Sequence, residues 1–258
     1  MKTPPSMSLD PTIAPRKGFR EAEDRVRRFW TEASASEAEG GFGVRLDHRD
    51  LKTSAGRRLV LPTQALAAAV AAEWAAQGEY LRPETMPLTR LAYTAIDRVA
   101  DHHAEVAEEA VRYLGSDVLC YPADQPRSLV QRQAERWGPW RDWAAERFGC
   151  PLKVGSGVSH VAQPAVALSA ALARAQAQDA FRLTGLAHAA ALFGSTVLAF
   201  AVLEGVLTGE EAFELSRLDE AFQVEQWGED EEAAERTAAL RKEALVVARW
   251  FGLLAQPL

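Results

Sequence analysis

The sequence predicts an α+β protein in which a small N-terminal region of antiparallel strands and a helix precedes a larger, mainly α-helical domain. Apolar and polar residues alternate between residues 40 and 61, helical spacing dominates from residue 63 onward, and no fixed-period repeat is visible. We expect a flexible N-terminal tail over residues 1–18, an α+β domain over residues 19–85 and a helical domain over residues 86–258.

The strands are predicted from period-two alternation. In "GGFGVRLDHRDLKTSAGRRLVLPT" the apolar residues Phe42, Val44 and Leu46 occupy alternate positions, which is typical of a half-buried strand. Polar turns separate this strand from short return strands, and residues 29–35 are expected to supply a first strand. Such short antiparallel strands need a second layer to cover their apolar face.

A helix after residue 63 is expected to supply that layer. Thr63 is a suitable N-cap, and the alanine-rich segment that follows has a high helix propensity. Trp74 is the large side chain of this segment, and we expect it to pack in the core. Pro83 and Pro87 then form a rigid link, because proline fixes its own φ angle and restricts the preceding residue; helical spacing resumes at Leu88.

Most of the remaining chain is predicted to be helical. Ser128 with Gln131 and Thr208 with Glu211 both match the capping-box pattern at the start of a helix. The apolar segment 186–205 approaches the length of a membrane span, but it is rich in alanine, contains polar residues and has no flanking basic cluster. We expect it to be a buried core helix, without membrane insertion.

Charge and cysteine content restrict the class of protein. The 258 residues carry a formal net charge of -7, whereas a general nucleic-acid binder needs clustered Lys and Arg for its phosphate contacts. The N-terminal residues contain neither the apolar core of a secretory signal nor the pattern of a transit peptide. We therefore expect a bacterial cytoplasmic protein in which Cys120 and Cys150 stay reduced.

Motifs for catalysis or cofactor binding are not visible. The glycines at 40–43 lead into a strand, and "GSG" at 155–157 lacks the further glycine and lysine of a phosphate-binding loop. The five histidines include no i, i+4 pair that could grip a metal ion on a helix. The sequence thus predicts neither a cofactor nor a metal site, and it favours a protein that is not an enzyme.

Two aromatic clusters allow more than one interpretation. Trp137, Trp140 and Trp143 could pack together at a corner between two helices near Pro139, or they could form an exposed patch that docks a partner protein.

The stretch "LDEAFQVEQWGEDEEAAE" combines Glu225, Trp227 and Glu231. Its acids could favour the start of a helix after Gly228, or they could face a basic or amide-rich surface of another protein.

Four blocks of the sequence together resemble one known family. They are "GGFGVRLDHRDLKTSAGRRLVLPTQALAAAVAAEW", the segment 77–97 with its "MPLTRLAYTAID", then "YLGSDVLCY" and "VEQWGEDEEA". The chain from about residue 20 to 250 is similar to the assembly chaperones that act on the alpha subunit of the F-type ATP synthase catalytic head. His48 and Ser54 depart from the family pattern, which affects the expected turn geometry.

The resemblance implies a monomeric chaperone that binds the unassembled alpha subunit and prevents its aggregation until the beta subunit replaces it. It also implies that Glu225, Trp227 and Glu231 contact that partner, with Trp137, Trp140 and Trp143 as further candidates. The carboxylates could instead brace the helical domain through an arginine such as Arg217 or Arg236. An alternative function is a small-molecule-binding protein or hydrolase with a pocket between the two domains.

Overall fold

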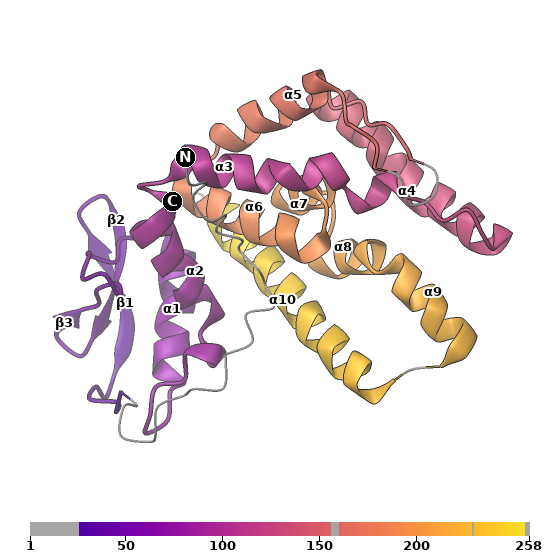
Figure 1. Ribbon diagram of the computed structural model, residues 1–258. Coiled ribbons are helices and arrows are strands. Elements are labelled where there is room, and N and C mark those ends of the chain that lie inside the picture. Colours follow the sequence, from indigo (N-terminus) through magenta and orange to yellow (C-terminus); the bar gives the residue numbers. More distant parts are fainter. Residues whose placement is uncertain (1–25, 156–159, 229, 256–258) are drawn as a thin grey trace, which may run out of the picture.

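The computed structural model describes residues 26–155, 160–228 and 230–255. A three-stranded antiparallel sheet at the N-terminal end precedes a larger assembly of helices (Figure 1), so the predicted α+β class is confirmed. The strands are β1 (Ala33–Ala38), β2 (Gly41–Leu46) and β3 (Arg49–Asp50). The tail predicted for residues 1–18 lies outside the described residues.

The α-helices of the described segments are α1 (Gln64–Ala75), α2 (Pro87–Thr94), α3 (His103–Arg112), α4 (Arg127–Phe148), α5 (Ala165–Gln176), α6 (Ala180–Phe193), α7 (Thr196–Leu203), α8 (Gly209–Ser216), α9 (Leu218–Trp227) and α10 (Glu231–Ala255). A π-helical turn, Ala95–Val99, follows α2 directly and precedes α3. One continuous cluster of buried apolar side chains extends from the sheet to the end of α10. The domain boundary at residues 85 and 86 stays a prediction.

The sheet confirms the predicted alternation of β2, in which Val44 and Leu46 are buried under α1. The first strand begins at Ala33, later than predicted, because the preceding residues pair elsewhere. The N–H of Arg28 donates to the carbonyl of Glu79, and the N–H groups of Thr31 and Glu32 donate to the side chain of Asp47. The expected strand at residues 29–35 was therefore wrong in its bounds.

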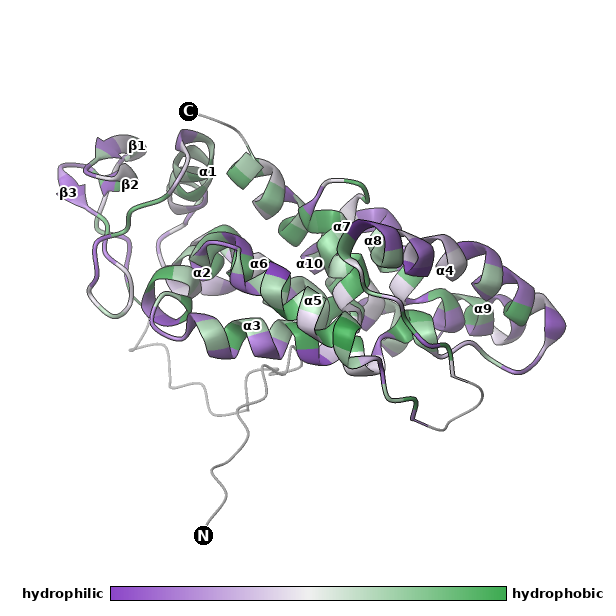
Figure 2. Ribbon diagram, turned by 90° about the horizontal axis from the view of Figure 1, so that it is seen from above, coloured by the Kyte–Doolittle hydropathy of each residue, from purple (hydrophilic) through white to green (hydrophobic). Residues whose placement is uncertain are grey.

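Helix α1 lies against the sheet as expected (Figure 2). Thr63 is its N-cap and accepts a hydrogen bond from the N–H of Leu66 at 3.1 Å. Trp74 is 7% exposed, and its ring centroid lies 5.0 Å from that of Trp30. The core position predicted for Trp74 is thus confirmed.

A carboxylate of α1 fastens the start of α2. Glu73 accepts hydrogen bonds from the backbone N–H groups of Leu88 and Thr89, each at 2.8 Å, and from the Thr89 hydroxyl at 2.7 Å. The first N–H groups of a helix lack partners inside the helix, and Pro87 at the first position has none to offer. Glu73 therefore fixes the angle between α1 and α2 across the proline link.

We expect Glu73→Gln to lower the free energy of unfolding by about 1–2 kcal/mol, because a charged acceptor for the N-terminus of α2 is lost. Urea unfolding measures this effect. Glu79→Gln is the matched control, since the Glu79 carboxylate forms an exposed ion pair with Arg27 and its loss should cost less than about 0.5 kcal/mol. Equal effects of the two substitutions would rule out the helix-fastening role.

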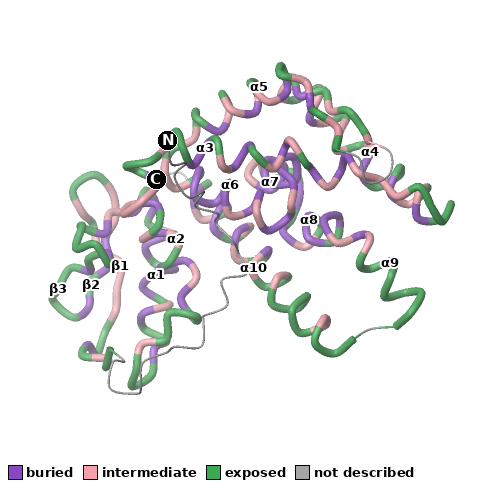
Figure 3. The backbone as a smooth tube through the Cα atoms, viewed as in Figure 1, coloured by how far each residue is buried: buried purple, intermediate pink, exposed green. Residues whose placement is uncertain are grey.

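The apolar segment 186–205 forms two helices instead of the single helix that was predicted. Gly194 adopts a left-handed φ of 60° and ends α6, and the Ser195 hydroxyl then accepts a hydrogen bond from the N–H of Leu198 to begin α7. Both helices are largely buried near the centre of the helical assembly (Figure 3). No helix among the described residues is long and apolar enough to cross a membrane.

Asp117 is a fully buried carboxyl group beside the start of α7. It accepts hydrogen bonds at 3.2 Å from the backbone N–H groups of Leu119 and Val197. Burial raises the pKa of Asp117 to about 6, although these bonds and one from the Ser195 hydroxyl act in the opposite direction.

This raised pKa predicts a pH dependence of stability. Between about pH 4 and pH 6 the folded chain keeps a proton on Asp117 that the unfolded chain has lost. The resulting stabilisation is complete below pH 4 and is lost as the pH rises through 6, a change on the order of 2–3 kcal/mol. Urea unfolding of the wild type and of Asp117→Asn, which cannot titrate, should therefore give curves of different pH slope. Parallel curves would contradict the prediction.

Candidate partner-binding site at the junction of α9 and α10

The end of α9 presents apolar side chains to solvent. Trp227 is 79% exposed and Val224, one helical turn earlier, is 42% exposed. Both lie next to the connection from α9 to α10, at the end of the molecule opposite the sheet (Figures 1 and 2). Exposure of so large an aromatic ring is unusual for a folded chain and marks a place where a partner can bury it.

Two acidic residues follow these apolar side chains, where the chain enters α10. Asp230 accepts a hydrogen bond from the N–H of Ala233 at 3.0 Å and so supports the start of α10. Glu231 is the first residue of α10, is exposed, and forms no ion pair within the described part of the chain. We call Val224, Trp227, Asp230 and Glu231 the acidic–aromatic tip.

Glu225 is held by another helix. Its carboxylate lies 2.7 Å from the guanidinium of Arg132 on α4, and that guanidinium stacks over the Phe222 ring with its carbon 5.2 Å from the ring centroid. The hydrogen bond from Arg132 lowers the pKa of Glu225. Bracing by an arginine was one of the two interpretations of this carboxylate, but the arginine is Arg132.

The two arginines suggested from the sequence pair with other carboxylates. Arg217 contacts Glu220 at 3.2 Å, and Arg236 contacts Glu232 at the same distance. The structure therefore separates the two predicted acidic residues: Glu225 is tied to α4, whereas Glu231 stays available to a partner.

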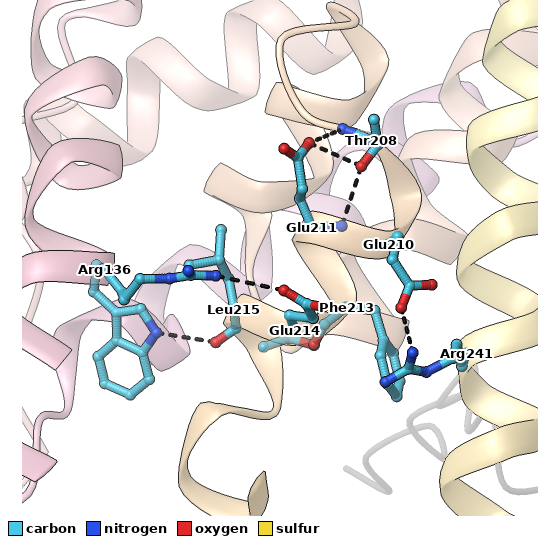
Figure 4. A network of polar contacts seen from close by, with 10 residues as sticks. Arg136, Thr208, Glu210, Glu211, Phe213, Glu214, Leu215 and Arg241 are labelled. Atoms are coloured by element: carbon cyan, nitrogen blue, oxygen red, sulfur yellow. Dashed lines mark hydrogen bonds and ion pairs between the residues drawn. The ribbon is translucent and has the colours of Figure 1, made fainter. Parts of the chain in front are cut away.

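Polar contacts on both sides hold α8, which leads into α9 (Figure 4). Glu214 faces Arg136 of α4 at 3.6 Å, and Glu210 pairs with Arg241 of α10. Thr208 and Glu211 form the predicted capping box at the start of α8. The other predicted capping box is wrong, because α4 begins at Arg127 after Pro126 and has no side-chain cap.

The three central tryptophans lie within one helix. Because α4 continues through Pro139, they do not form a corner between two helices. Trp137 is fully buried and donates its indole N–H to the carbonyl of Leu215 at 2.9 Å, so it is a core residue and not part of an exposed patch. Trp140 and Trp143 are half-buried and pack edge to face with ring centroids 5.9 Å apart.

A cleft with a volume of about 470 Å³ lies within the helical part, between the end of α6 and the start of α9. Arg217, Asp219 and Glu220 line it. It is therefore not the pocket between two domains that the alternative function requires. No group of three or more potential metal ligands occurs among the described residues.

Comparison with solved structures decides the family. Atp12 from Paracoccus denitrificans is 43% identical and superposes with a TM-score of 0.84, covering 88% of this chain and 97% of that one. The chain belongs to the ATP12 chaperone family. The model of that family, described as ATP12 chaperone protein, matches residues 27–145. This is the family of ATP synthase assembly chaperones that the sequence resembles.

Two further relatives extend the comparison. A solved structure from Agrobacterium tumefaciens is 40% identical, with a TM-score of 0.81, over 87% of this chain and 84% of that one. The mitochondrial protein atp12 of Schizosaccharomyces pombe is 25% identical over 232 residues, which are 81% of this chain and 76% of that protein.

Sequence reasoning missed two features at the end of α9. Val224 could have been found, because it lies three residues before Trp227 and so shares its helical face. The pairing of Glu225 with Arg132 could not, because 93 positions separate them and only the packing of α4 against α9 brings them together.

Proposed function

We propose that this ATP12-family chaperone binds the unassembled alpha subunit of the ATP synthase catalytic head and prevents its aggregation until the beta subunit replaces it. Membership of the ATP12 chaperone family supports a role in ATP synthase assembly. The choice of the alpha subunit rests on the sequence resemblance, and the protein acts as a monomer.

The acidic–aromatic tip is the observation that carries this proposal. Its exposed Trp227 can enter an apolar pocket of a partner. The Glu231 carboxylate can form an ion pair with a lysine or an arginine, or accept a hydrogen bond from a backbone N–H group. An unassembled subunit exposes apolar surface that would be buried in the finished complex, and such surface causes aggregation. A chaperone that covers it needs binding energy and no catalytic group.

The proposed activity is therefore stoichiometric and independent of a cofactor. The net charge of -7 favours a partner surface that is basic. We place the protein in the bacterial cytoplasm, whereas the S. pombe relative is a mitochondrial protein.

Size-exclusion chromatography tests the proposal. We expect the chain to form a 1:1 complex with isolated alpha subunit and to leave that complex when beta subunit is added. Mixing the chain with beta subunit alone is the control and should give no complex. If the chain forms no complex with the alpha subunit but is stabilised by small molecules, it is a ligand-binding protein and the proposal fails.

A further inference from the structure

The strand β1 leaves one edge of the sheet open. Among the residues that the structure describes, the strand order is β1-β2-β3 and β1 pairs only with β2. On the side of β2 that faces away from β1, Phe42 exchanges backbone hydrogen bonds with Leu61, and the carbonyl of Val44 accepts one from the N–H of Leu51. The intervening residues of β2 therefore bond to β1, and by the register they do so at residues 34, 36 and 38.

Consequently, the backbone N–H and C=O groups of Ala33, Ala35 and Glu37 point away from β2. Across residues 26–155, 160–228 and 230–255, no hydrogen bond outside the β1–β2 ladder reaches these groups. They form a regular row of donors and acceptors along one edge, which is the arrangement that an added strand requires.

Lysine and proline, two common protections of an edge strand, are missing from β1. Its sequence, Ala-Ser-Ala-Ser-Glu-Ala, contains no lysine and no proline, and its register with β2 runs without a bulge from Ala33 to Ala38. Apart from Glu37 its side chains are small, and Ala33 and Ala35 are half-buried against the core. An edge of this kind is suited to pairing.

Charge indicates the chemistry of the partner. Glu32 and Glu37 form no ion pair in the described part of the chain, and Glu39 meets Arg58 only at 3.9 Å. Pairing β1 with β1 of a second copy would bring these acids together, and facing like charges destabilise a strand pair. A segment that carries lysine or arginine is favoured instead.

We infer that β1 accepts an extended, basic segment of the unassembled alpha subunit as a fourth strand; this inference rests on the function proposed above. The sheet and the acidic–aromatic tip lie at opposite ends of the molecule (Figures 1 and 2). Two separated contacts on one partner raise the overall affinity, because the second contact forms within the existing complex.

Hydrogen exchange read by mass spectrometry tests the inference on the full chain, alone at two concentrations and in complex with isolated alpha subunit. The amides of Ala33, Ala35 and Glu37 should exchange rapidly in the free chain and at least about tenfold more slowly in the complex. The exposed amide of His48, in the turn between β2 and β3, is the internal control and should not change.

Ala35→Pro provides a second test. Proline removes only an outward N–H and is tolerated at a strand edge, so the pairing of β1 with β2 is kept. We expect its affinity for the alpha subunit to fall at least about tenfold, whereas Ala35→Ser, which keeps the N–H, should bind normally. Glu37→Lys should also weaken binding, and this exposed substitution leaves the backbone untouched.

The outcomes separate the possible occupants. Slow exchange of these amides in the free chain overturns the inference. If the protection rises with concentration, a second copy occupies the edge. If it does not depend on concentration, another segment of this chain occupies the edge. A complex with unprotected β1 amides and normal binding by Ala35→Pro also overturns it, but leaves the proposed function intact. If no complex forms, both proposals fail.

Discussion

Replacing Trp74 by arginine is expected to lower the free energy of unfolding by about 3 kcal/mol or more. The substitution removes a buried ring that packs against Trp30 and places a charge between α1 and the sheet. The indole N–H of Trp74 has no hydrogen-bond partner among the described residues, so apolar packing accounts for its position. The soluble yield should fall sharply.

Ala72→Arg is the matched control for this substitution, because Ala72 lies on the exposed face of the same helix. It should change the free energy of unfolding by less than about 0.5 kcal/mol. Urea unfolding or thermal melting compares the two variants. A melting temperature of Trp74→Arg close to that of the wild type would contradict the core role of this tryptophan.

The second large effect is expected on binding. Trp227→Ala and Glu231→Gln should each weaken the complex with the alpha subunit by about 2 kcal/mol, or roughly thirtyfold, with the melting temperature nearly unchanged. Both side chains are exposed, and neither is needed by the core. Isothermal titration calorimetry measures the loss.

Two controls accompany these variants. Val166→Ala removes another exposed apolar side chain, on α5, and Glu232→Gln removes the neighbouring carboxylate, which pairs with Arg236. Both should bind the alpha subunit as the wild type does. Glu225→Gln should weaken binding less than Glu231→Gln, because Glu225 is engaged by Arg132. Normal binding by both Trp227→Ala and Glu231→Gln would place the binding surface elsewhere.

Local patterns in the sequence predicted the order of structural classes and several helix starts. The alternation of Val44 and Leu46 predicted β2, and Thr63 and Thr208 were found as N-caps, because each signal depends on neighbouring residues. The break at Gly194 was missed, since an apolar run looks the same whether it forms one helix or two.

The candidate site was less predictable than the fold. The sequence identified Trp227 and Glu231 as candidates, but it did not show that Glu225 is paired with an arginine. Arg132 reaches Glu225 only through the packing of α4. Likewise, the burial of Trp137 depends on its contact with Leu215 of α8, 78 positions away. Local spacing contains no information about such contacts.

Light scattering during dilution of isolated alpha subunit from denaturant tests the central claim most directly. An equimolar amount of the wild-type chain should suppress aggregation, and the double variant Trp227→Ala/Glu231→Gln, with an unchanged melting temperature, should not. Equal protection by the wild type and this variant would contradict the assignment of binding to the acidic–aromatic tip. Aggregation that the wild type does not reduce would contradict the proposed function itself.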